Sequence, residues 1–142
     1  MDARKKKNLI NEYRNCLINS VNTEEFPEND DEMDGYLSSS LGDDYFFGTD
    51  ETARNEKKAC FFYENSADNG NAYGQYKAGM LNAVLAMEEG DDVRLVYGIK
   101  YLCDSYKNGY PYAYNALDLF VKTNFFPFNS VTALVDFIDK NS

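Results

Sequence analysis

The stretch YENSADNGNAYGQYKAG, residues 63–79, decides the fold. It indicates the end of one helix, a stop at Gly70 and the start of a second helix, because glycine readily adopts the left-handed conformation that ends helices. A shorter version, LCDSYKNGYPYAYNAL, follows at residues 102–117 with its own stop at Gly109, 39 residues after the first. We therefore predict that Gly70 and Gly109 have positive φ and turn two helical hairpins.

Small residues align with small residues at this offset, and aromatic residues align with aromatic residues. The aligned pairs are Ser66 with Ser105, Asn69 with Asn108, Tyr73 with Tyr112, Phe62 with Tyr101, and Gly74 with Ala113. Two helices per unit and a period in this range are typical of an α/α solenoid. Small residues allow neighbouring helices to pack closely. The sequence therefore predicts an all-α repeat fold.

Residues 52–120 resemble the Sel-one-like repeat family, a relative of the tetratricopeptide repeat. The matching positions are Ala59, Phe62–Tyr63, Ser66–Ala67, Gly70, Ala72, Gly74, Gln75, Ala78 and Gly79, then Gly98, Tyr101–Leu102, Gly109, Ala113 and Leu117. The chain departs from the family pattern at MEEGDDV (87–93), at Ala78, where leucine is usual, and at Ser105–Tyr106, where an alanine pair is usual. The resemblance implies a short solenoid of about two hairpins that binds other proteins on a concave face lined by the first helix of each hairpin.

We interpret residues 1–142 as a single helical-repeat domain. An N-terminal helix is expected within 1–21, the repeat hairpins within 52–122 and a C-terminal capping helix within 123–142. Two apolar stripes with a helical period support the terminal helices. The stripes are Leu9, Ile10, Tyr13, Cys16, Leu17 and Val21 at one end, and Val131, Leu134, Val135 and Ile138, after an N-cap at Asn129 or Ser130, at the other.

Residues 22–51 form an acidic segment with eleven carboxylates, and no Lys or Arg occurs between positions 15 and 53. Pro27 and several glycines predict loops around one short helix near EMDGYLSSSL (32–41). Residues 30–41 superficially suggest a calcium-binding loop, but Leu41 occupies the twelfth position, which requires a bidentate glutamate. A solvated acidic loop is the default interpretation.

The composition limits the possible functions. The 142 residues include 24 Asp and Glu, 14 Lys and Arg, and no His, for a net charge of −10. Without His there is no Ser–His or Cys–His nucleophile and no Cys–His zinc site. We therefore expect no enzyme, no catalytic residue, no cofactor and no metal. The negative charge argues against nucleic acid as a ligand.

Other features of the composition concern location and the cysteines. No apolar run approaches the length of a membrane span, and the N-terminus does not resemble a signal peptide. We therefore expect a cytoplasmic protein that does not bind membranes. Cys16, Cys60 and Cys103 fall in helical patterns, where cysteine usually behaves as a small buried residue.

Candidate partner-binding residues come from two groups, the tyrosines of the hairpins' first helices and the carboxylates near the end of the acidic segment. They are Tyr73, Tyr76, Tyr112, Tyr114, Asp43, Asp44, Asp50 and Glu51. Tyrosine supplies contact area at low entropic cost, and carboxylates steer a basic partner. The plainer alternatives are that the aromatic residues are core, as we expect for Tyr63, Tyr97 and Tyr101, and that the carboxylates only aid solubility. Mimicry of nucleic acid is a more specific form of the charge hypothesis.

Three classes of function remain. The first is a small acidic inhibitor or immunity protein that neutralises a basic toxin or effector by direct binding. The second is an adaptor or scaffold, which is the commoner role of proteins that resemble this repeat family. The third is an enzyme that uses carboxylates alone. The sequence favours a non-enzymatic protein-binding module of the first class.

Overall fold

The computed structural model describes residues 2–20, 22, 24–123 and 127–141. Within these residues the chain forms seven α-helices and no β-strand, which confirms the prediction of an all-α fold. The helices are α1 (Ala3–Asn19), α2 (Asp30–Phe47), α3 (Glu56–Asp68), α4 (Ala72–Glu89), α5 (Asp92–Lys107), α6 (Ala113–Lys122) and α7 (Val131–Lys140).

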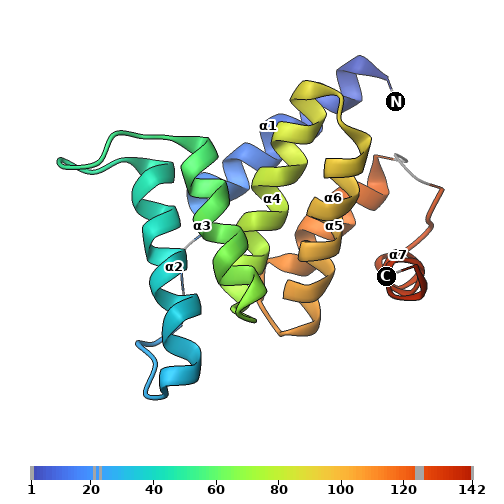
Figure 1. Ribbon diagram of the computed structural model, residues 1–142. Coiled ribbons are helices and arrows are strands. Elements are labelled where there is room, and N and C mark those ends of the chain that lie inside the picture. The colour runs from blue at the N-terminus through green and yellow to red at the C-terminus, as the bar shows by residue number, and fades with distance from the viewer. Residues whose placement is uncertain (1, 21, 23, 124–126, 142) are drawn as a thin grey trace.

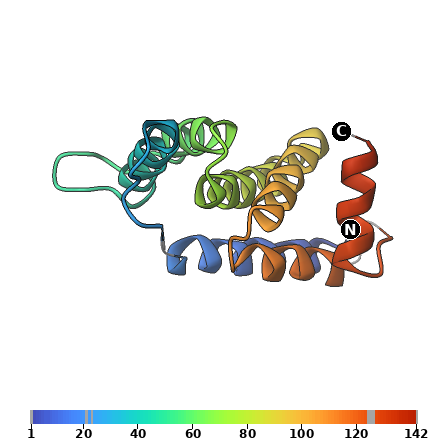
Figure 2. The ribbon, with the colours of Figure 1, turned by 90° about the horizontal axis from the view of Figure 1, so that it is seen from below.

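Helices α2 to α5 form one layer in which successive helices run alternately up and down (Figure 1). Helices α1 and α6 lie together on one side of this layer, crossing beneath α4 and α5, whereas α7 stands beside α5 at the end of the layer (Figure 2). Helix α4 contacts α1, α2, α3 and α5, and its residues 73–84 are all buried. The core is therefore centred on α4.

The two glycine stops have the same local structure. The φ angle is 83° at Gly70 and 84° at Gly109, as predicted. The amide of Asn71 donates to the Ser66 carbonyl at 3.2 Å, and the equivalent bond 39 residues later, from Tyr110 to Ser105, measures 3.1 Å. Both glycines therefore close their helices with the same 6→1 hydrogen bond.

Helices α4 and α5 touch through their backbones. A Cβ added to Gly79 would lie 2.8 Å from the Gly98 carbonyl oxygen, and a Cβ added to Gly98 would lie 2.8 Å from the Gly79 carbonyl oxygen. A similar device joins α3 to its neighbours, because the Ser66 hydroxyl donates to the Gly35 carbonyl of α2 at 2.6 Å and fills the space beside Gly74 of α4. Small residues thus set the spacing of the layer, as expected from the sequence.

The prediction of loops around one short helix in the acidic segment is wrong, because α2 is an 18-residue helix. Its buried stripe consists of Gly35, Ser38, Ser39, Gly42 and Phe46. Four of these five residues are Gly or Ser, so the helical period carries almost no hydrophobic signal. Gly42 is required inside the helix because the Tyr63 ring lies where a Cβ would be. The first turn is acidic, which suits the positive end of the helix dipole.

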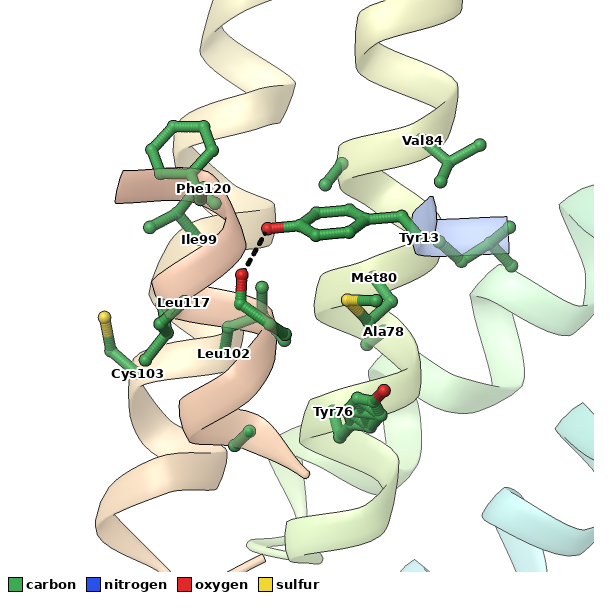
Figure 3. Close-up of a cluster of buried hydrophobic side chains, with 14 of the residues drawn as sticks. Tyr13, Tyr76, Ala78, Met80, Val84, Ile99, Leu102, Cys103, Leu117 and Phe120 are labelled. Atoms are coloured by element: carbon green, nitrogen blue, oxygen red, sulfur yellow. Dashed lines mark hydrogen bonds between the residues drawn. The ribbon is translucent and has the colours of Figure 1, made fainter. Parts of the chain in front are cut away.

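Helix α1 is anchored to the layer by its predicted stripe. Leu9, Tyr13 and Leu17 are buried, and Val21 lies outside the described residues. The Tyr13 hydroxyl crosses the core and donates to the Ala116 carbonyl of α6 at 2.7 Å (Figure 3). Helix α7 buries its predicted stripe, and Ser130 is its N-cap. Cys60 and Cys103 are buried and Cys16 is half-buried.

Candidate functional site

The four candidate tyrosines divide into two pairs. Tyr112 and Tyr114 are exposed, whereas Tyr73 and Tyr76 are only 1% exposed. Tyr76 is covered from the α1 side, where the Ser20 hydroxyl donates to its phenol oxygen at 3.0 Å, and its ring packs against Tyr110. The assignment of Tyr73 and Tyr76 as contact residues is therefore corrected, because both belong to the core.

One candidate carboxylate is also turned inward. Asp43 accepts hydrogen bonds from the Tyr63 hydroxyl at 2.5 Å and the Tyr73 hydroxyl at 2.9 Å. Burial raises the pKa of Asp43 above its ordinary value, while the two phenols and Lys77 act in the opposite direction. Burial and the Asp43 carboxylate in turn raise the pKa of both phenols. Asp43 therefore joins α2 to α3 and α4 and does not present its charge to a partner.

Lys77 is the buried cation that sequence reasoning missed. Its side chain is 0% exposed, and burial lowers its pKa to about 8. The ammonium donates to the Leu17 carbonyl of α1 and lies 5.2 to 5.5 Å from the ring centroids of Phe46, Phe47 and Tyr73. The signal was present in the sequence as the single charge within AYGQYKAGMLNAVLAM, residues 72–87. Because aromatic rings and backbone enclose it, Lys77 anchors α1 and is closed to solutes.

The exposed candidate carboxylates Asp44, Asp50 and Glu51 lie toward the C-terminal end of α2 and in the loop that follows it. Other carboxylates gather at the opposite end of α2, around a hollow of about 610 Å³. Its charged lining consists of Glu24, Glu25, Glu28 and Glu32, and its amide lining consists of Asn29, Asn69, Asn71 and Asn108. We call this feature the acidic hollow.

No Lys or Arg lines the acidic hollow within the described part of the chain. Glu24 accepts a hydrogen bond from the Asn71 side-chain amide at 2.7 Å, so one carboxylate is held in place. Glu25, Glu28 and Glu32 are exposed. The arrangement can bind a cationic group by charge and by hydrogen bonds, because carboxylates and amide oxygens both accept from ammonium and guanidinium donors.

The two exposed candidate tyrosines lie near the same end of the layer. Asn108 lines the acidic hollow, and the turn that follows it carries Tyr112. Tyr110 links the core to this surface, because its ring packs against the rings of Tyr76 and Tyr112. Tyr114 packs against the exposed Tyr106. The structure therefore places Tyr112 and Tyr114 toward the hollow's end of the layer, away from Asp50 and Glu51.

The described residues include Cys, Asp and Glu side chains, which are the types that bind metals or act as nucleophiles. No group of three or more His, Cys, Asp or Glu side chains among them is arranged to hold a metal ion. Burial raises the pKa of Cys60 and of Cys103 to about 12, so both thiols are protonated at neutral pH. None of the described helices has the length and apolar character needed to cross a membrane.

Comparisons of the chain with protein-family models, with curated proteins and with solved structures give no match. Function is therefore inferred from the geometry of the acidic hollow and of the covered core.

Proposed function

We propose that this chain is a non-enzymatic protein-binding module of the inhibitor or immunity type, which neutralises a basic toxin or effector domain by covering its basic surface. The acidic hollow carries the proposal. It combines four glutamates, a concave shape of about 610 Å³ and the absence of any cation among its described lining residues. A hollow of that size accepts a Lys or Arg side chain of a partner.

Three groups of catalytic type are held in structural contacts. Lys77 is enclosed by α1 and aromatic rings, Asp43 is held by two phenols, and Cys60 lies in the core. A general acid or base must reach the proton that it transfers. Lys77 and Cys60 are buried, and Asp43 is half-buried and held by two phenols. The restricted access to these three groups supports binding over reaction.

Because α1 covers one side of the α2–α5 layer, we favour an inhibitor over an adaptor. The resemblance to the Sel-one-like family implies a concave binding face formed by the first helices of the hairpins. Here α1 covers the corresponding face of α4, where Tyr76 and Lys77 are buried. The matching turns at Gly70 and Gly109 support our inference that the chain is a short repeat fold. The acidic end of the layer is a surface that α1 leaves open to a partner.

The carboxylates at the acidic end of the layer would steer a basic partner toward it. Carboxylates at the rim of an interface mainly raise the association rate, and their effect weakens as salt screens them. Tyr112 and Tyr114 would supply short-range contact area, because aromatic side chains carry much of the energy in protein interfaces.

Two triple variants with the same change in charge test the proposal. One replaces Glu25, Glu28 and Glu32 by Gln at the hollow, and the control replaces Asp44, Asp50 and Glu51 by their amides. The wild-type chain is used to capture a partner from a lysate of the source organism, and association rates are then measured at low and high salt. We expect a partner with a basic surface, a roughly tenfold or greater fall in association rate for the hollow variant, and less than about twofold for the control.

Three results would contradict the proposal. The partner could be acidic, the rates could be insensitive to salt, or the two triple variants could have equal effects. The last result would show that net charge alone, and no particular surface, governs association.

A further inference from the structure

Helix α5 carries two apolar stripes. One contains Leu95, Ile99 and Leu102 and is buried in the core. The other contains Val93, Val96 and Tyr97 and faces away from the core, with Val93 69% exposed and Tyr97 60% exposed. The expectation that Tyr97 is a core residue is therefore wrong. A helix that is apolar on two sides is typically covered on both, so the second stripe marks a contact surface.

Helices α5 and α7 lie next to each other (Figure 2), and the exposed stripe borders a groove of about 430 Å³ between them. Val93, Val96, Tyr97 and Phe137 line the groove with apolar atoms, and Lys100 is the only charged residue along it within the described chain. The Phe137 ring is itself exposed. The same surface thus carries the exposed ring of Tyr97 and a groove into which a ring of a second molecule can fit.

We propose that this surface is the interface of a symmetric dimer, in which α5 of one copy packs antiparallel against α5 of a second copy. A two-fold interface must be self-complementary, because each copy presents the same patch to the other. Here Tyr97 of each copy can enter the groove between α5 and α7 of the other. Most soluble homo-oligomers are two-fold dimers of this kind.

The charges along α5 specify the second copy as the occupant. If the two-fold axis passes between Val96 and Tyr97, the helical rise places Lys100 opposite Val93 of the second copy and next to its Asp92. Asp92 and Lys100 are both exposed, and neither forms an ion pair within the described residues. Antiparallel pairing would therefore give two equivalent Lys–Asp contacts at the edges of an apolar centre.

Sedimentation equilibrium of the full chain tests this proposal. We expect a mass twice the 16.2 kDa of the chain. Tyr97→Glu should weaken the dimer at least tenfold, whereas the control Ile18→Glu, which also places a charge at an exposed apolar position, should leave it unchanged. Circular dichroism and thermal melting of both variants check that they are folded.

A charge exchange tests the antiparallel arrangement. Lys100→Asp should weaken the dimer, and the double variant Lys100→Asp with Asp92→Lys should restore it, because the two contacts are rebuilt with reversed signs. These residues are exposed, so folding is not at risk. A wild-type chain that stays monomeric, equal effects of Tyr97→Glu and Ile18→Glu, or failure of the double variant to restore the dimer would each overturn the proposal.

The dimer goes beyond the proposed function and uses a different surface, so the two can fail separately. Their salt dependence has opposite signs. Each copy carries a net charge of −10, so screening by salt should strengthen the dimer, whereas it should weaken binding of a basic partner.

Discussion

The two sides of the α2–α5 layer use the same residue types in different ways. On the side that carries α1 and α6, Tyr13 and Tyr76 are buried and their hydroxyls have hydrogen-bond partners. On the side of α5 that faces away from α1, Tyr97 is exposed beside two valines. The difference is that α1 covers one side and no described helix covers the other (Figure 2).

Whether a tyrosine of this chain is buried depends on contacts with residues that are far away in the sequence. Tyr13 donates to the carbonyl of Ala116, which lies 103 positions away. Tyr76 and Tyr97 both occur at helical spacing among apolar residues, so their local sequences predict similar surroundings. Tyr76 is buried by the docking of α1 and by the Tyr110 ring, whereas Tyr97 is exposed.

The largest expected effect is the loss of a ring on the covered side. Tyr13→Ala should lower the free energy of unfolding by about 3–5 kcal/mol, because it leaves a cavity and an unpaired Ala116 carbonyl. The matched change Tyr97→Ala should cost less than about 0.5 kcal/mol, because that ring is exposed. Urea unfolding at low protein concentration, where any dimer is dissociated, measures both values. Equal costs would show that α1 does not cover the layer in solution.

The pH dependence of Lys77 provides a second test of the cover. The pKa of Lys77 is about 8 in the folded chain, against an ordinary value of 10.5. Between these values the unfolded chain binds more protons than the folded chain, so the contribution of Lys77 to stability rises with pH. Below pH 8 both states are protonated, and the cost of the buried charge is fully present.

The measurement compares the wild type with Lys77→Met, which lacks this titration. From pH 7.5 to 10.5 the wild type should gain about 2–3 kcal/mol relative to the variant. Ionisation of the tyrosines affects both proteins and cancels in the difference. A difference that does not change with pH would indicate that Lys77 is solvated, and hence that α1 lifts away from α4.

The sequence predicted the elements whose signals are local. The helix stops at Gly70 and Gly109 and the stripe of α7 follow from glycine chemistry and hydrophobic period, and the structure confirms them. Helix α2 was missed because Gly and Ser form its buried stripe, and their small side chains matter only against the Tyr63 ring and the Ser66 hydroxyl of α3.

The candidate site was predicted only in part, because tertiary packing also decides which of its side chains are exposed. The concentration of carboxylates is visible in the sequence, but its division into an inward Asp43 and an acidic hollow at the other end of α2 depends on tertiary packing. Tyr112 and Tyr114 remain exposed, and Tyr73 and Tyr76 do not.

Effects smaller than those at Tyr13 and Lys77 are expected at the two glycine turns. No atom lies within 4 Å of a Cβ added to Gly70 or Gly109, so a side chain there costs only backbone strain. Replacing either glycine by valine should lower the free energy of unfolding by about 1 kcal/mol or slightly more, because a β-branched residue resists positive φ. Since the φ angles differ by only one degree, the two costs should agree within the error of urea unfolding. A much larger cost at Gly109 would mean that this turn also positions α6 for its packing against α1. Unchanged stability in both variants would show that the turns reach their conformation without a left-handed residue.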